Sequence, residues 1–361
     1  MKKELINYSE VLRMNQEFLL ELLSTASPSG AEMEIQHKWM DYVKEFADEM
    51  KTDNAGNAIG VLNPNAEFKV LLAGHCDEIG FMVKKIDQDG FIRVEKLGGI
   101  SHKPAIGMKV TILGTHGKLT GVFGVNAEHH GGAKEFNFED LYIDCGATSK
   151  EEIEKYIQIG DLAVYKREVE HLLNDRISGR GLDNRTGSFI VAEVLRKLAK
   201  RNPKVGVYAV STVNEETNMG GAYFAGAGIQ PTMAIACDVT FSSDYPGIDA
   251  RKHTEVNLGD GPVLAKGAPI NIKINQLLEK AAKKLDLKLQ YELTPRMTGT
   301  DADKLRLTGY GVPISLVSLP LRYMHAPVET VSLKDMQEEI DLLVEMIAEL
   351  TGEESVNPLS K

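Results

Sequence analysis

A short apolar run, residues 70–73, leads directly into the segment GHCDEIG at residues 74–80. A parallel strand that is covered on both faces has such a continuous apolar sequence, because neither face meets water. In open α/β sheets, ligands bind in the crevice at the carboxyl ends of the strands. We therefore predict a buried strand that ends at a chemically active site containing His75 and Asp77.

The residue pattern of the sequence changes after this strand. Residues 81–170 contain short β-type runs such as FIRVEKL, MKVTILG and DLAVYK, separated by Asp-Gly and Gly-Gly pairs. Such runs, bounded by turn residues, are typical of all-β structure. We predict an inserted all-β, barrel-like domain over residues 78–172.

The flanking segments, residues 1–77 and 173–361, have the alternating helix and strand pattern of one α/β domain. Apolar residues recur at helical spacing in AEMEIQHKWMDYVKEFA and again after Asp183, and VGVYAVSTV, PTMAIA and VPISLVSL are typical of buried strands. Ser332 and Asp335 begin the last helix with a capping pattern. The predicted fold is a parallel-rich α/β sheet with helices on both faces, interrupted by the barrel-like insert.

The composition excludes several classes of partner. The chain has a formal net charge of -11 and no long basic cluster, which disfavours nucleic acid and anionic membrane surfaces. We find no apolar stretch of transmembrane length, and charges interrupt the N-terminal segment before a signal-like apolar region forms. Three scattered cysteines do not make a disulfide framework. We therefore expect a cytoplasmic protein.

Four strands are expected to end in polar side chains that can bind metal ions. If these strands are parallel, their carboxyl ends meet at one edge of the sheet, and the carboxylates gathered there require a cation to remain ionised together. Histidine and carboxylate ligands without thiolates suit zinc, cobalt or manganese. The residues concerned are His75, Asp77, Glu215, Glu216, Asp238 and His325.

Each of these residues also has a simpler interpretation. Adjacent glutamates are often solvated, Asp183 could cap the helix that follows it, and His325 could be a core histidine. Cys76 and Cys237 are better read as small buried apolar residues than as ligands. What favours the metal site is that solvated or capping residues have no reason to gather at the ends of apolar strands.

The chain resembles the glutamyl and deblocking aminopeptidases, the tetrahedral family of dinuclear metallo-aminopeptidases known as metallopeptidase family forty-two. The resemblance covers nearly the whole length. It rests on GHCDEIGFMV, DLYIDCGA, DRISGRGLDNRTG, NEE, DVTFSSDYPGID, GTDAD and PLRYMHAPVET, in this order. It implies a zinc-exopeptidase-like catalytic domain that releases N-terminal residues from peptides.

The resemblance also implies roles for individual residues. His75, Asp183 and Asp238 would hold one divalent metal ion, and Asp183, Glu216 and His325 would hold a second, with Asp183 bridging the two. Glu215 would be the general base, and Asp77 the acid behind His75. The resemblance further implies zinc or cobalt, with manganese as an alternative, and homo-oligomers built from dimers that can form a tetrahedral dodecamer.

Some features depart from the family or leave alternatives open. The family usually continues Glu-Glu-Val-Gly-Leu-Arg, whereas this chain has Thr217 to Gly220, where we expect Asn218 to take the positive φ of the replaced glycine. We expect His129 and His130 to lie in an exposed loop. A dinuclear carboxypeptidase or deacylase, a polysaccharide hydrolase and a non-catalytic scaffold remain alternative functions.

Overall fold

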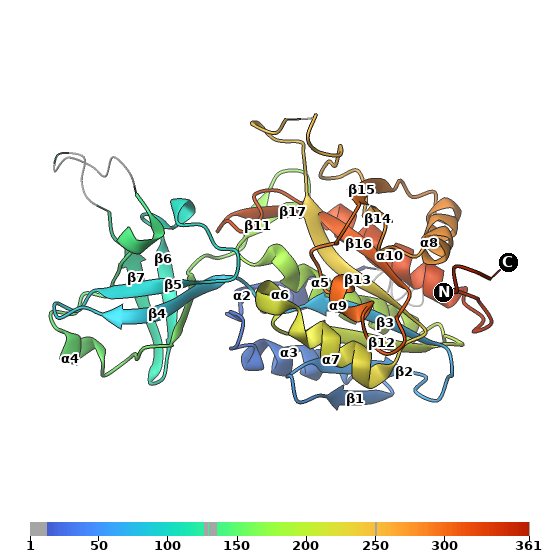
Figure 1. The fold of residues 1–361 in the computed structure, drawn as a ribbon, viewed down its shortest axis with the longest axis horizontal. Coiled ribbons are helices and arrows are strands. Elements are labelled where there is room, and N and C mark those ends of the chain that lie inside the picture. Colours follow the sequence, from blue (N-terminus) through green and yellow to red (C-terminus); the bar gives the residue numbers. More distant parts are fainter. Residues whose placement is uncertain (1–12, 126–128, 130–135, 250, 361) are drawn as a thin grey trace, which may run out of the picture.

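The computed structural model describes residues 13–125, 129, 136–249 and 251–360. It consists of an α/β body and a β-barrel that lies beside one end of it, as Figure 1 shows. Within the described residues, no helix is long and apolar enough to span a bilayer. The α/β sheet with an inserted barrel confirms the predicted fold class.

The body is built on an eight-stranded sheet. Its strands, in sheet order, are β1 (Glu49–Thr52), β2 (Ala58–Leu62), β12 (Gly206–Thr212), β3 (Lys69–His75), β13 (Met233–Phe241), β16 (Ile314–Leu321), β14 (Val263–Gly267) and β15 (Gln290–Thr294). The central strands β12, β3, β13 and β16 are mutually parallel, whereas β2 runs antiparallel to β12 and β14 antiparallel to β16. The parallel centre therefore brings the predicted strand ends to one edge.

Helices cover both faces of this sheet. The helices of one face are α2 (Gln16–Ser24), α3 (Met33–Val43), α5 (Leu182–Leu198), α8 (Ile272–Lys284) and α10 (Leu333–Ala348). The second face carries α7 (Gly220–Ile229) and the short α9 (Ala302–Leu305). Ser332 caps α10 by accepting the backbone N–H of Asp335 at 3.3 Å, as the sequence predicts. Burial of apolar side chains on both faces stabilises the central strands.

The insert contains a closed antiparallel barrel. Its strands, in barrel order, are β4 (Gly80–Ile86), β5 (Ile92–Leu97), β8 (Ile143–Asp144), β7 (Gly117–Phe123), β6 (Lys109–Gly114) and β9 (Leu162–Tyr165). Short helical turns η1 (Lys103–Ala105), η3 (Phe138–Asp140) and α4 (Lys150–Ile153) connect them. Phe81 packs against Phe123 and Tyr165 inside the barrel. The barrel therefore has a core of its own, separate from the cores on the sheet faces.

A small three-stranded antiparallel sheet links the C-terminal end of the insert region to the body. It contains β10 (Glu170–Leu172), β11 (Arg176–Gly179) and β17 (Glu329–Ser332). β11 leads into α5 and β17 leads into α10, so this sheet holds the starts of both helices beside each other. Residues 179–183 and 325–329, which are far apart in the sequence, thus meet next to the central strand ends.

Candidate metal centre

The side chains predicted from the strand ends do converge. His75 is the last residue of β3 and pairs in register with Thr212, the last residue of β12. Asp238 lies within β13, opposite Ser318 of the neighbouring strand β16. Parallel pairing of these strands therefore places His75 and Asp238 at one edge of the sheet, where the chain after β12 also emerges.

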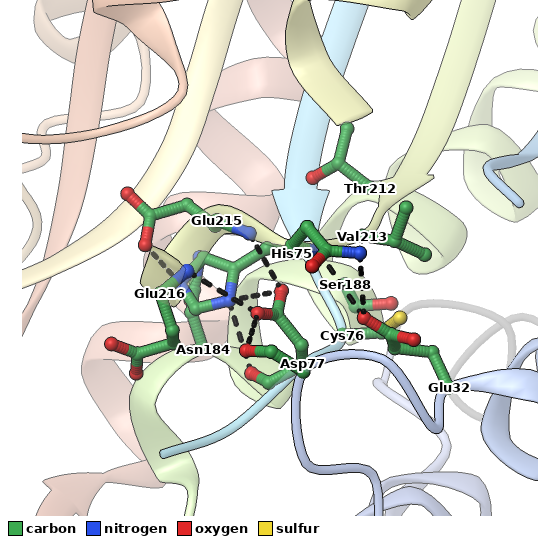
Figure 2. Close-up of polar contacts among 12 residues, drawn as sticks. Glu32, His75, Cys76, Asp77, Asn184, Ser188, Thr212, Val213, Glu215 and Glu216 are labelled. Atoms are coloured by element: carbon green, nitrogen blue, oxygen red, sulfur yellow. Dashed lines mark hydrogen bonds and ion pairs between the residues drawn. The ribbon is translucent and has the colours of Figure 1, made fainter. Parts of the chain in front are cut away.

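Glu215 and Glu216 are not strand residues. β12 ends at Thr212, Asn214 has a positive φ of 58°, and the two glutamates begin the short helix α6 (Glu215–Asn218). Successive side chains on a helix point in different directions without lying on opposite faces, as they would in a strand. Both glutamates can therefore face the same cluster, and Figure 2 shows them on either side of His75.

Asp183 lies between the two histidines. Its Oδ1 is 3.4 Å from His75 Nε2, and its Oδ2 is 3.3 Å from His325 Nε2. Asp183 has non-helical backbone angles, φ -78° and ψ 108°, and it is Asn184 whose Oδ1 accepts the backbone N–H of Gly187 at 2.9 Å where the helical turns begin. The helix-cap interpretation of Asp183 is therefore wrong, and its two oxygens instead face different imidazoles.

His75 is surrounded by carboxylates on the side of Nε2. Besides Asp183, Glu215 Oε2 lies 3.6 Å and Asp238 Oδ1 3.9 Å from that nitrogen. On its other side, Nδ1 lies 3.1 Å from the backbone oxygen of Asp77 and 3.4 Å from Asp77 Oδ1. A proton on Nδ1 would bond to Asp77, which leaves the Nε2 lone pair directed at the cluster.

Asp77 connects this histidine to the two glutamates. Its Oδ1 accepts the backbone N–H of Glu215 at 3.0 Å, and its Oδ2 accepts the N–H of Glu216 at 3.2 Å (Figure 2). The hydroxyl of Ser29 also donates to Oδ2. Asp77 is completely buried. It is therefore placed to fix where α6 begins, in addition to facing the ring of His75.

His325 is held by contacts from two directions. Its backbone, at a φ of 62°, donates its N–H to Glu329 Oε1 at 2.8 Å. Its Nδ1 lies 3.2 Å from the carbonyl oxygen of Gly99, which belongs to the insert, and its Nε2 lies 3.6 Å from Glu216 Oε2. A Cβ at position 99 would stand 2.6 Å from Nδ1, so only glycine permits this approach. The insert therefore helps to position a residue of the site.

The electrostatics of the cluster indicate that it needs positive charge. Burial, together with Asp238 and other nearby carboxylates, raises the pKa of Glu215 to about 9. Burial and the neighbouring Asp183 raise the pKa of Glu216 and also that of Asp238 well above its usual range. Burial opposes the protonation of His75, but the charge of Glu215 and contacts with Asp183 and Asp77 raise its pKa overall.

Asp183 responds in the opposite direction. Burial would raise its pKa, but contacts with both imidazoles lower the pKa below its ordinary value. In the protein alone, protons and imidazolium ions thus supply the charge that the carboxylates require. Glu216 Oε1 is buried and has no hydrogen-bond partner among the described residues. Divalent cations would satisfy this oxygen and replace the protons.

Two groups of ligand atoms are close enough to share an ion. The ligand atoms of His75, Glu215 and Asp238 lie within 4.8 Å of one another, as do those of His75, Asp183 and Glu216. These groups overlap with the predicted ligand sets without being identical to them, since Glu215 is close enough to act as a ligand. Nitrogen and oxygen donors of this kind suit zinc, cobalt or manganese.

Two further residues of the site do not belong to the predicted set. Glu329 accepts the backbone N–H of Asp183 at 3.2 Å as well as that of His325, and burial raises its pKa well above normal. Asp301 is buried and accepts the hydroxyl of Thr212. Glu329 and Asp301 lie within PLRYMHAPVET and GTDAD, but neither follows an apolar strand directly, so the strand-end pattern does not single them out.

The cluster opens into a cavity of about 700 Å³. The segment 297–300 forms part of its wall, together with Thr217, Asn218 and Met219. Met219, at a φ of 58°, has the positive φ that we predicted for Asn218, which is helical instead. The turn therefore survives with a methionine in the left-handed conformation.

The remaining predicted residues lie outside the cluster. His129 is exposed, in agreement with the loop interpretation, and His130 lies outside the described residues. Cys76 and Cys237 are buried, free thiols, as expected for apolar core residues.

Comparison with known proteins shows which family the chain is similar to. The family model of the M42 glutamyl aminopeptidases matches residues 56–342. Lysyl aminopeptidase of Pyrococcus furiosus is 34% identical over 343 residues, which covers 92% of this chain and 97% of that protein.

Two solved structures are similar over most of their length. Aminopeptidase APDkam598 from the archaeon Desulfurococcus kamchatkensis is 34% identical, with a TM-score of 0.88 and coverage of 93% of this chain and 95% of that one. The TET1 peptidase of Pyrococcus horikoshii, which can assemble into a tetrahedron or a large octahedral shell, is 29% identical, with a TM-score of 0.83 and coverage of 92% and 99%. The chain therefore belongs to the M42 glutamyl aminopeptidase family and is, by class, a peptidase.

Proposed function

We propose that this protein is a metal-dependent aminopeptidase that removes N-terminal residues from peptides. The observation that carries this proposal is the carboxylate of Asp183, each of whose oxygens faces a different histidine at 3.3–3.4 Å. A carboxylate in this position can bridge two cations and fix the distance between them. Membership of the aminopeptidase family supports the same function.

The ligand sets are those that the family resemblance implies, and the proximity of their side chains supports them. His75, Asp183 and Asp238 would hold one divalent ion, and Asp183, Glu216 and His325 the other. The unpartnered Oε1 of Glu216 and the all-nitrogen and oxygen donor set fit zinc or cobalt, with manganese as an alternative. Two such ions, when bound, would lower the pKa of a water molecule between them and polarise the scissile carbonyl.

Glu215 would act as the general base. Its carboxylate is adjacent to the cluster, where it can reach an attacking water. Its side chain is only 9% exposed, so the carboxylate is largely shielded from bulk solvent. It would accept a proton from that water and deliver it to the departing amine. Asp77 supports this role, because it holds the backbone N–H groups of Glu215 and Glu216.

A panel of aminoacyl p-nitroanilides tests the proposal. The chain is stripped of metal with a chelator and reconstituted separately with zinc, cobalt or manganese. Each preparation is then assayed on free-amine substrates and on their N-acetylated counterparts. We expect metal-dependent hydrolysis of the free-amine substrates alone. Release of acetate, or of the C-terminal amino acid, from an N-acetylated dipeptide would instead indicate a deacylase or a carboxypeptidase, respectively, and activity on cellulose without peptide hydrolysis would indicate a polysaccharide hydrolase.

We also infer that the protein forms homo-oligomers, since the related TET1 peptidase assembles into closed shells. The insert over residues 78–172 would contribute the dimer contacts. Excision of this insert should give smaller particles in light scattering. An unchanged particle mass after clean excision would contradict the assignment of the insert to assembly.

A further inference from the structure

A half-buried glutamate lies in the wall of the cavity, away from the metal ligands. Glu292 of β15 lines the cavity together with Thr240 of β13. Its Oε2 accepts the hydroxyl of Thr240 at 2.6 Å, and its Oε1 accepts the hydroxyl of Ser318 at 2.8 Å. Each carboxylate oxygen has two lone pairs, so both can still accept a further hydrogen bond. The carboxylate is thus fixed in position and still able to bind.

No basic side chain of the described residues forms an ion pair with Glu292, and only burial and the two hydroxyls affect its pKa. Burial raises that pKa, and a cation brought next to the carboxylate would favour its ionised form. Lys304 also lines the cavity, but it stands on α9 and forms no ion pair with Glu292. Within the part of the chain that the structure describes, Glu292 therefore lacks a counter-ion.

The distance from the metal ligands fits a long side chain. Asp238 and Thr240 are two residues apart on β13, and side chains at that spacing point to the same face about 7 Å apart. The Thr240–Glu292 hydrogen bond therefore places the acid roughly one such step beyond the cluster. A four-carbon side chain that starts near the metal centre can bridge a step of this length.

Part of the surrounding wall is apolar. Phe241, Leu293 and Met297 line the same cavity and are 62%, 70% and 67% exposed, respectively. Lysine and arginine bury their methylene stems against such surfaces while the charged end reaches a polar partner. The cavity thus combines an apolar stretch of wall with an acid that has no ion-pair partner among the described residues.

We propose that Glu292 is a specificity-determining residue that selects substrates with a basic N-terminal residue. This inference rests on the proposed aminopeptidase function. The ammonium or guanidinium group of the substrate would bond to the Glu292 carboxylate, and its stem would lie along Phe241, Leu293 and Met297. Thr240 and Ser318 keep the carboxylate oriented toward the incoming cation.

The test compares p-nitroanilides of lysine, arginine, norleucine and glutamate. Norleucine has a similar length to lysine but carries no charge. We expect the wild type to have a higher kcat/KM for lysine than for norleucine, and Glu292→Gln to reduce that ratio by about 10- to 100-fold, the range expected for a lost charge-assisted hydrogen bond. Hydrolysis of the norleucine substrate should change by less than about threefold under the same conditions, because its stem contacts remain.

Two further variants serve as controls. Glu292→Asp keeps the charge and should retain part of the preference for lysine, whereas Lys304→Met should not abolish it. The inhibition constants of lysine amide and norleucine amide give the preference for the lysine side chain from binding alone. The inference is overturned if Glu292→Gln lowers kcat/KM equally for every substrate. It is also overturned if the wild type prefers the glutamate substrate and this preference depends on Lys304. In either case hydrolysis of norleucine p-nitroanilide still supports the aminopeptidase function. If the wild type does not hydrolyse that substrate, both the role of Glu292 and the aminopeptidase function are refuted.

Discussion

Replacement of Glu215 by glutamine separates its two conceivable roles, base and ligand. Glutamine has nearly the same shape but cannot accept the proton of an attacking water. Glu215 lies 3.6 Å from His75 Nε2 and is close enough to His75 and Asp238 to share an ion with them, so its role must be tested rather than assumed. If Glu215 is the general base, both ions should stay bound while the chemical step fails.

The magnitude follows from the chemistry of proton transfer. General acid–base assistance contributes ~10²–10⁴-fold, so kcat should fall by at least this order while KM changes much less. In the metal-free protein, the pKa of Glu215 is raised to about 9, so an ionised carboxylate there is costly at pH 8. Glu215→Gln removes this cost and should leave the metal-free protein at least as stable as the wild type.

The assay combines kinetics with metal analysis on the same samples. Glu216→Gln is the matched control, since its position next to Glu215 is similar but its proposed role is that of a ligand. Its activity should fall because one ion is lost, and excess metal should partly restore it. Loss of an ion from Glu215→Gln, or near-normal kcat with both ions bound, would refute the assignment of the base.

Three other perturbations test the geometry of the site. Asp183→Asn should weaken binding of both ions, because one carboxylate faces both imidazoles; two tightly bound ions by elemental analysis would contradict this. Gly99→Ala should weaken binding of the ion near His325, because the new Cβ would stand 2.6 Å from Nδ1 of that histidine. Metal titration should show about tenfold lower affinity at one site only, which corresponds to about 1.4 kcal/mol. An unchanged titration would contradict the contact between Gly99 and His325. In the metal-free protein, the raised pKa of Glu215 gives a stabilising contribution that is complete below pH about 4.5 and is lost as the pH rises to about 9. The Tm of the chelated protein should therefore fall across this range, less steeply in Glu215→Gln, and a Tm that rises with pH would contradict the electrostatic account.

The sequence alone determined the features that depend on local pattern. The apolar run at residues 70–73 predicts a buried parallel strand, because a continuous apolar run leaves neither face for solvent. The turn-rich segment after it predicts a separate β domain. Ser332 caps α10 as predicted, because a cap involves residues only three positions apart. The strand-end pattern also singles out most of the cluster, but Asp183 enters only through the family resemblance, and Glu329 and Asp301 are not singled out.

The tertiary structure alone decided which distant groups meet. Gly99 reaches His325 across 226 positions, and Asp77 accepts N–H groups 138 and 139 positions away. Glu292 faces the cavity because β15 lies beyond β14 in the sheet order, which no local pattern specifies. Local periodicity determines the conformation and buried face of a segment, but contacts between segments depend on strand order and on helix placement. The residue types of the site are therefore readable from the chain, whereas their precise neighbours are a property of the fold.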